Sequence, residues 1–260
     1  MPETTIRISR ERKELLAKYA TAACFLYGVI SVEEFAEVFN HYEPDLATTA
    51  EEAPLALERH SKATPNTTEY SIKDGIITEP FSSPGIDEYY EINVKAIRKA
   101  QKGKPRYLPD KEEYLKYQKF SYREPSKQYD ALKAYIIKHK LTDNGEGAVG
   151  IEGDLLTLFQ NIQLNAPPQK LIEQFTDSGY KFKDINAINE FIGLLMDVCN
   201  NTRRYDNNDF TPNEIFEKFE RPKLRPLPKE PFVFPTAPIP SKNGAYSCGS
   251  GKKYKRCCGK

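Results

Sequence analysis

The chain has 260 residues, with 38 basic and 37 acidic side chains that give a formal net charge of +1, and 39% of it is hydrophobic. This length suits one large or two small domains with a buried core. No run approaches the roughly 18 apolar residues of a membrane span, no apolar export segment opens the chain, and five cysteines are too few for a disulfide scaffold. We therefore expect a cytoplasmic protein without a membrane span.

Helical periodicity marks the first sixty residues. Apolar residues recur at intervals of three and four over residues 10–27, which predicts a helix, and Cys24 adjoins its buried stripe as a small core residue. Ser31 and Glu34 form a capping box that predicts the start of a second helix. An acidic third helix is predicted over residues 50–60.

A β-hairpin is predicted near residues 69–80. Polar and apolar residues alternate up to Lys73, Asp74-Gly75 supplies the two residues of a type I′ turn, and an Ile-Ile-Thr run returns. Three helices followed by a hairpin are also the order of a winged helix. Its reading helix would be residues 50–60, whose acidic side chains would repel phosphates, so sequence-specific DNA reading through that helix is not expected.

More helices are predicted toward the C-terminus. Their signals are, in chain order, a capping box from Asp110 to Glu113, an apolar stripe from Tyr129 to Ile136, helical patterns over 154–163 and Ile185–Cys199, and a capping box with an N1 proline at Thr211. The sequence therefore predicts a mainly α fold in two lobes, residues 1–142 with the hairpin and residues 143–220. The boundary is expected in the glycine-rich stretch 142–153.

A change of composition follows the second lobe. Arg221–Lys260 carries ten basic residues and a single acid, and its first twenty residues include seven prolines. Proline lacks an N–H and fixes φ, so neither a helix nor a sheet can run through this stretch. We predict an extended, semi-rigid linker over residues 221–243 and a separate basic tail over residues 244–260.

Patterns that resemble nucleotide-binding or catalytic motifs lack the context that these motifs require. Residues 145–150 spell G-x-G-x-x-G but follow a helical segment instead of a strand. Residues 249–252 resemble the end of a P-loop without its first glycine or its hydroxyl residue. Each of the three histidines lacks a second ligand at metal-binding spacing. The sequence gives no positive evidence for an enzyme, and no small-molecule substrate is evident.

Three of the five cysteines, Cys248, Cys257 and Cys258, lie within eleven residues of the tail. Thiolates are ligands for zinc. The cationic side chains that lie among them lower the cost of keeping several thiolates together, and they are Lys252, Lys253, Lys255 and Arg256. A disulfide between the two adjacent cysteines is disfavoured, because neighbouring Cα atoms lie only about 3.8 Å apart.

Cys248, the Gly-Ser-Gly-Lys-Lys-Tyr run after it (residues 249–254), and Cys257-Cys258-Gly259 match the SEC-C motif position for position. The tail thus resembles this small zinc knuckle, which is named after the C-terminal tail of the bacterial preprotein-translocase ATPase. The resemblance implies zinc binding and contact with proteins, including an export chaperone and the ribosome. Residues 200–214 and 221–235 are also similar to a group of bacterial proteins that end in SEC-C, a resemblance that brings no known activity.

One position departs from the family pattern. The first cysteine of the motif should stand at position 246, where this chain has Tyr246, a poor zinc ligand at neutral pH. Three thiolates remain, one short of a closed tetrahedral site. A water, a carboxylate, a histidine of the body or a side chain of a partner could supply the fourth ligand. We expect a protein-interaction module that binds zinc through the three tail cysteines.

Nucleic-acid binding is the alternative. The segment from Val94 to Arg106 carries six basic residues with tyrosines on both sides, and together with the tail it could bind RNA or DNA. A solvated helix face is the competing interpretation. Residues 200–214 are also similar to the end of some transposase cores, which place acids on a mixed sheet. Five or more strands in the body would favour that reading.

Overall fold

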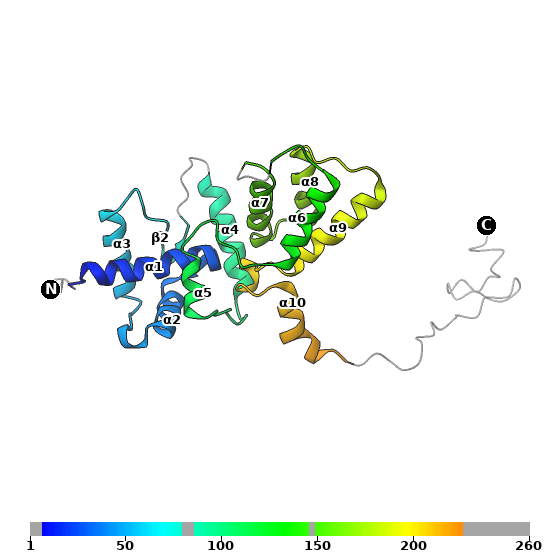
Figure 1. The fold of residues 1–260 in the computed structure, drawn as a ribbon. Coiled ribbons are helices and arrows are strands. Elements are labelled where there is room, and N and C mark those ends of the chain that lie inside the picture. The colour runs from blue at the N-terminus through cyan, green and yellow to red at the C-terminus, as the bar shows by residue number, and fades with distance from the viewer. Residues whose placement is uncertain (1–6, 80–85, 146–148, 226–260) are drawn as a thin grey trace, which may run out of the picture. The chain divides into compact units, whose positions relative to one another are not determined.

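The computed structural model describes residues 7–79, 86–145 and 149–225. The fold is mainly α-helical with one small antiparallel sheet, as the sequence predicts (Figure 1). The first elements are, in chain order, α1 (Arg10–Tyr27), β1 (Val29–Ser31), α2 (Val32–Tyr42), η1 (Pro44–Leu46), α3 (Glu52–Ala63), β2 (Ser71–Lys73), β3 (Ile76–Thr78), α4 (Ile86–Gln101) and α5 (Lys111–Lys116). The later elements are α6 (Lys127–His139), α7 (Ile151–Gln163), α8 (Pro168–Asp177), α9 (Ile185–Asn200), η2 (Tyr205–Asn207), α10 (Pro212–Ile215), η3 (Phe216–Glu220) and η4 (Arg221–Lys223).

Two of the three predicted capping boxes are present, whereas Asp110 begins α5 without a side-chain capping hydrogen bond, so the predicted box with Glu113 does not form. The side-chain oxygen of Ser31 accepts a hydrogen bond from the Glu34 N–H, and the Glu34 carboxylate accepts one from the Ser31 N–H. Thr211 and Glu214 make the same reciprocal pair at the start of α10. Each box satisfies two N–H groups that the first turn of a helix leaves without a partner.

The predicted hairpin is β2–β3, and its turn has the expected geometry. Asp74 and Gly75 both adopt positive φ, 52° and 74°, as a type I′ turn requires. A third strand, β1, pairs antiparallel with β3, so the sheet order is β1-β3-β2. Residues 10–78 therefore follow the element order and the strand order of a winged helix. The described residues contain these three short strands and no others.

The first lobe has a core that is rich in buried tyrosines. Tyr19, Tyr27 and Tyr114 are fully buried. The Tyr19 and Tyr114 rings stack with their centroids 5.5 Å apart, and the Tyr19 ring meets that of Phe39 edge to face at 5.0 Å. Their hydroxyls have partners, since Tyr114 donates to the Tyr19 carbonyl at 2.9 Å and Tyr27 donates to the Tyr107 carbonyl at 2.9 Å. These bonds remove the cost of burying a hydroxyl and tie α5 and the segment before it to α1.

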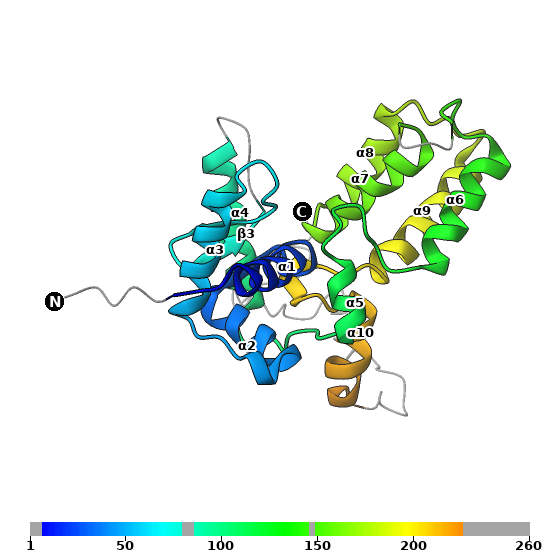
Figure 2. The same cartoon turned by 60° about the vertical axis from the view of Figure 1, so that its left-hand side comes forward.

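The second hydrophobic core begins at Tyr129, which lies before the predicted boundary at residue 142. The apolar stripe of α6 packs against α9, so α6 belongs with α7, α8 and α9. Figures 1 and 2 show these four helices grouped together, apart from α1, α2 and α3. The glycine-rich stretch lies between α6 and α7 inside this group. The chain passes from the first core to the second through residues 118–126 instead.

The chain then returns to the first lobe after α9. Residues 205–210 lie against α4 and the segment after it, whereas the predicted second lobe extended to residue 220. The Asn208 side-chain amide donates to the carbonyl of Gln101 at 3.1 Å and to that of Lys104 at 2.9 Å. The Tyr107 N–H donates to the Asn208 carbonyl at 3.0 Å. Asn208 adopts the left-handed conformation, which asparagine tolerates better than most residues.

Residues 1–222 form one compact unit and residues 223–260 a second. The division falls at the start of the predicted linker. The proline-rich linker and the tail at residues 226–260 lie outside the described residues. In the part of the chain that is described, no helix is both long and apolar enough to span a membrane.

Candidate functional site

The residues predicted to bind metal are not among those that the structure describes. Tyr246, the three tail cysteines Cys248, Cys257 and Cys258, and the basic residues Lys252, Lys253, Lys255 and Arg256 all lie in the segment 226–260. Within residues 7–79, 86–145 and 149–225, no group of three or more His, Cys, Asp or Glu side chains is placed to hold a metal ion.

The two cysteines of the body are parts of the hydrophobic cores. Cys24 on α1 is fully buried in the first core, and burial raises the pKa of its thiol well above the usual value. Cys199 on α9 packs against the second core, and burial raises the pKa of its thiol to about 11. Both thiols are therefore protonated at neutral pH, and among the described residues neither belongs to a group of side chains placed to hold a metal ion. The prediction that Cys24 and Cys199 are core residues is therefore confirmed.

Several basic side chains of the Val94–Arg106 stretch have partners within the fold. The Arg98 guanidinium lies 2.5 Å from the Glu34 carboxylate, and that of Arg106 lies 3.2 Å from it. The Lys104 ammonium donates to the Asp206 carbonyl at 2.7 Å. These three cations hold α4 and the segment after it against α2 and η2. The stretch therefore offers phosphates fewer available charges than its composition indicates.

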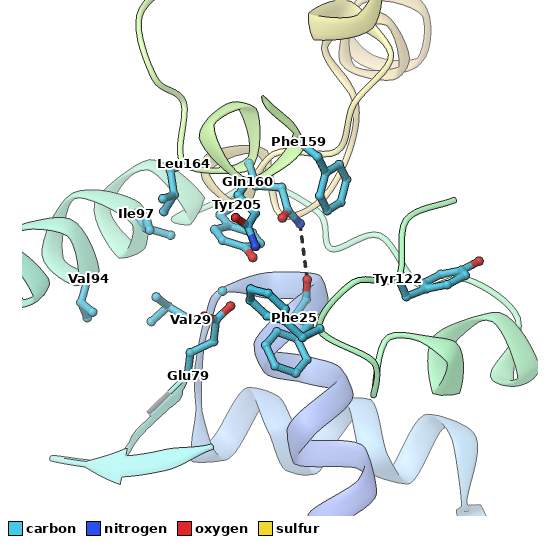
Figure 3. Close-up of a pocket in the computed structure, with 13 residues that line it drawn as sticks. Phe25, Val29, Glu79, Val94, Ile97, Tyr122, Phe159, Gln160, Leu164 and Tyr205 are labelled. Carbon is cyan, nitrogen blue, oxygen red and sulfur yellow. Dashed lines mark hydrogen bonds between the residues drawn. The ribbon is translucent and has the colours of Figure 1, made fainter. Parts of the chain in front are cut away.

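A cavity of about 280 Å³ lies where the two cores meet (Figure 3). The end of α1 contributes Phe25 and Gly28, α4 contributes apolar side chains, α7 contributes Phe159 and two glutamines, and η2 contributes Tyr205. Most of the lining is apolar. Such a cavity, with a few polar groups, is the usual form of a small-molecule site, and its volume is near the lower end of the range for such sites, roughly 300–1,000 Å³.

Glu79 is the acidic residue of the cavity lining. It follows β3, and its side chain projects into the cavity between the end of α1 and η2 (Figure 3). Burial alone raises the pKa of its carboxyl group to about 7. Among the described residues, no ion pair or hydrogen bond reaches this carboxylate. The site therefore contains an acid that ionises near neutral pH in surroundings that do not compensate its charge.

Replacing Glu79 with glutamine is expected to stabilise the protein in a pH-dependent way. The folded-state pKa is about 7 and the unfolded value is near 4.5, so the acid destabilises the fold progressively as the pH rises from about 4.5 through 7. Glu79→Gln should raise the free energy of unfolding by up to about 3 kcal/mol at pH 8 and by under about 1 kcal/mol at pH 5.

Urea unfolding followed by circular dichroism at both pH values measures this difference. Glu58→Gln, on the exposed side of α3, is the matched control and should change little at either pH. An effect of Glu79→Gln that is equal at pH 5 and pH 8 contradicts the raised pKa.

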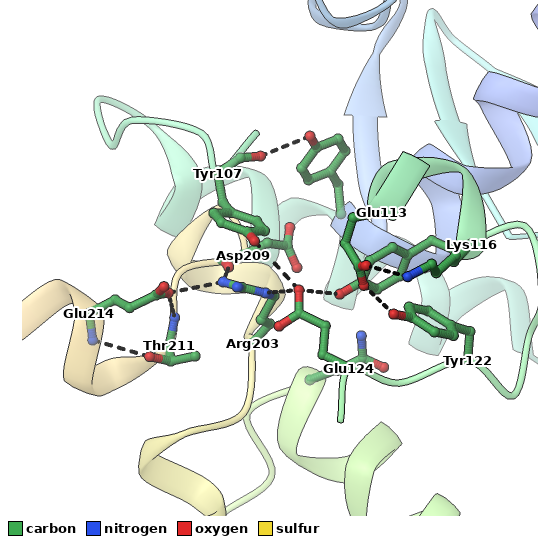
Figure 4. Close-up of polar contacts among 12 residues, drawn as sticks. Tyr107, Glu113, Lys116, Tyr122, Glu124, Arg203, Asp209, Thr211 and Glu214 are labelled. Carbon is green, nitrogen blue, oxygen red and sulfur yellow. Dashed lines mark hydrogen bonds and ion pairs between the residues drawn. The ribbon is translucent and has the colours of Figure 1, made fainter. Parts of the chain in front are cut away.

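Apart from the cavity, a cluster of polar side chains centred on Arg203 joins the two segments of chain that run between the lobes (Figure 4). The Nε atom donates to the Glu124 carboxylate at 2.8 Å, and Nη1 donates to the Glu214 carboxylate at 2.9 Å and to the Asp209 carbonyl at 2.9 Å. The guanidinium also lies 3.4 Å from the centre of the Tyr107 ring. The cluster connects the segment at Glu124, which leads from the first lobe to the second, with the segment at Arg203, which leads back. The Arg203 guanidinium and the two carboxylates pair with one another.

Asp209 lies beside this cluster with its carboxylate fully buried. Neither side-chain oxygen has a hydrogen-bond partner in the described structure. Burial raises the pKa of Asp209 well above its usual value, against the opposing charges of Arg106 and Arg203. Asp209 is therefore a buried acid of the lobe junction, and it does not line the cavity that contains Glu79. We assign it a structural place.

Comparisons of the chain with protein-family models, with curated proteins and with solved structures give no match. The described residues form a mainly helical fold with a small three-stranded antiparallel sheet. Sequence reasoning did not find the cavity or Glu79. The only local signal at Glu79 is an acid directly after a strand, and such acids are usually solvated. The apolar walls around it come from several separate segments, from the end of α1 to η2.

Proposed function

We propose that the protein is a cytoplasmic interaction protein whose SEC-C-like tail binds zinc and contacts another protein. One observation carries the proposal: Cys248, Cys257, Cys258 and the Gly-Ser-Gly-Lys run stand at the positions that the motif requires. The two cysteines of the body also support the proposal. Burial in the cores keeps the Cys24 and Cys199 thiols neutral, so the tail holds the three cysteines that remain as candidate ligands. Free cysteines in the body also suit a reducing compartment.

The tail fits zinc in its donor chemistry, although it has one ligand fewer than a closed site. Three thiolates can hold the ion, and the neighbouring cations lower the free energy of keeping those thiolates ionised. A fourth ligand from water or from a partner completes a tetrahedron. A ligand supplied by a partner would couple metal binding to the interaction. The same cationic residues, Lys252, Lys253, Lys255 and Arg256, suit an acidic protein surface.

The interaction is tested by capture experiments with the full chain, a chain that ends at residue 240, and the Cys257→Ser/Cys258→Ser variant. Proteins captured by the full chain alone, and released by a zinc chelator, support the proposal. Cys199→Ser is the matched control, since it removes a thiol from the core without touching the tail, and it should keep the same partners. Identical captured proteins with all four chains contradict the proposal.

Restoring the motif's first cysteine is expected to strengthen zinc binding. Tyr246→Cys supplies a fourth thiolate and should lower the zinc dissociation constant by at least about tenfold, since even groups that only orient metal ligands are worth roughly 10–100-fold. Competition with a chromophoric chelator measures this. Asn243→Cys is the control, because it adds a thiol next to the tail at a position outside the motif. Equal gains from the two variants contradict a knuckle geometry.

Binding of RNA or DNA is the weaker candidate, because Arg98, Lys104 and Arg106 have partners within the fold. It would rest on the exposed Lys99 and Lys102 together with the tail. Such binding falls steeply with salt, because neutralised phosphates release counterions. A flat salt response for a fluorescent oligonucleotide excludes it. A steep response that a Lys99→Gln/Lys102→Gln variant reduces favours it.

A further inference from the structure

We propose that the cavity at the meeting of the two cores binds a small organic ammonium ion with an apolar body, and that Glu79 is its counter-ion. This site is separate from the tail and does not depend on zinc. The inference rests on the enclosed acid, the aromatic walls and the aliphatic floor, all of which belong to described residues (Figure 3).

The charge of the site selects the charge of the ligand. Glu79 is the acidic residue that lines the cavity, and Lys and Arg are absent from the described lining. Its titratable neighbours, Cys24 and Tyr205, both have a pKa raised by burial, so they stay neutral between pH 6 and 8. The cavity sides from α4 and α7 contribute Val94, Ile97 and uncharged glutamines. A bound cation would supply a partner that the described residues do not give the Glu79 carboxylate, whereas an anion would be repelled.

The aromatic walls favour an ammonium group over a metal ion. Rings of Phe25, Phe120, Phe159 and Tyr205 line the cavity, and those of Phe25 and Phe120 meet edge to face with centroids 5.7 Å apart. Aromatic faces attract organic cations, whereas a divalent metal needs several oxygen, nitrogen or sulfur ligands. Figure 3 shows the Glu79 carboxylate directed toward the rings of Phe25 and Tyr205.

The rest of the lining defines the ligand's body. Val29, Val94, Ile97 and Leu164 present aliphatic side chains to the cavity. The Gln163 amide is engaged with the Phe25 carbonyl at 3.4 Å, so it helps to hold α7 to the end of α1. Apolar surface buried against these side chains would supply affinity, and the carboxylate would supply selectivity for the amine.

Binding should depend on pH in a defined direction. The Glu79 pKa of about 7 leaves the carboxyl mostly protonated at pH 6 and mostly ionised at pH 8. A ligand that remains protonated over this range binds the ionised form. Its apparent dissociation constant should therefore fall by roughly tenfold from pH 6 to pH 8, in proportion to the competent fraction.

The test uses the full chain with 2-phenylethylamine as the probe and 2-phenylethanol as its neutral isostere. Methyl NMR follows the titration, since Val29, Val94, Ile97 and Leu164 are reporters within the cavity. The expected result at pH 8 is a saturable shift of these methyls, with the amine bound at least about tenfold more tightly than the alcohol. Glu79→Gln should remove the preference for the amine, and Glu58→Gln, on the exposed side of α3, should retain it.

A second variant separates occupancy of the cavity from its charge. Val94→Phe reduces the free volume and should abolish binding of both probes while circular dichroism keeps the spectrum of the parent protein. Three outcomes overturn the proposal: the alcohol binds as tightly as the amine, Glu79→Gln keeps the preference, or the shifts lie at methyls away from the cavity. Removing residues 241–260 should leave amine binding unchanged, so failure here and failure of the tail proposal are distinguishable.

Discussion

Replacing Arg203 with methionine is expected to lower the free energy of unfolding by about 3–5 kcal/mol, because removing one partner of a buried ion pair leaves the other uncompensated. The side chain of Arg203 is only 11% exposed, and it holds the half-buried carboxylates of Glu124 and Glu214. Methionine keeps much of the length and apolar volume of the arginine stem. The loss therefore reports the charges and hydrogen bonds rather than a cavity.

Urea unfolding followed by circular dichroism measures this loss, with an unchanged dependence on urea concentration as the sign that the folded state is otherwise intact. Arg10→Met is the matched control. Its ion pair with Glu14 is exposed, with 84% of the Arg10 side chain accessible, and should contribute less than about 1 kcal/mol. Adding Glu124→Gln to Arg203→Met should recover part of the stability. A loss below about 1 kcal/mol for Arg203→Met contradicts the assigned role.

Replacing Gly28 with alanine is expected to destabilise the protein by about 2–5 kcal/mol, from backbone strain together with steric overlap. Gly28 ends α1 with φ 68° and ψ −50°, a conformation that side chains rarely permit. An added Cβ would lie 2.7 Å from the Cγ atom of the Tyr205 ring and closer still to its edge. Because Gly28 also lines the cavity, the same change should weaken amine binding.

Gly75→Ala separates strain from overlap. Gly75 has φ 74° and nothing within 4 Å of an added Cβ, so alanine there should cost only about 1–2 kcal/mol. Thermal unfolding of the two variants gives the comparison. If Gly28→Ala is no more destabilising than Gly75→Ala, the close approach of the Tyr205 ring does not contribute and the packing of η2 on α1 is different from that described.

Local signals predicted most of the secondary structure correctly. The capping boxes at Ser31 and Thr211 and the Asp74-Gly75 turn were recognisable because each depends on residues within three or four positions of one another. The periodic stripe over Ile185–Cys199 likewise corresponds to α9. Strand β1 gave no such signal, since three buried residues are too short a run to show a period.

The arrangement of the lobes could not be predicted from local patterns. Whether α6 packs against α9 or against the first lobe depends on complementary surfaces far apart in sequence, and the glycine-rich stretch 142–153 suggested a boundary that the cores do not follow. The cavity has the same origin. Phe25, Glu79, Phe159 and Tyr205 acquire their common environment only when four separate segments meet. The shifted pKa of Glu79 is therefore a property of the tertiary structure.

The most direct test of the central claim is the zinc content of the full chain, purified under reducing conditions and equilibrated with zinc and a competing chelator. The tail proposal predicts about one zinc per chain, as a single knuckle would hold, a clear drop for Cys257→Ser, and no change for Cys199→Ser. A stoichiometry below about one half that Cys257→Ser leaves unaltered contradicts zinc binding by the tail.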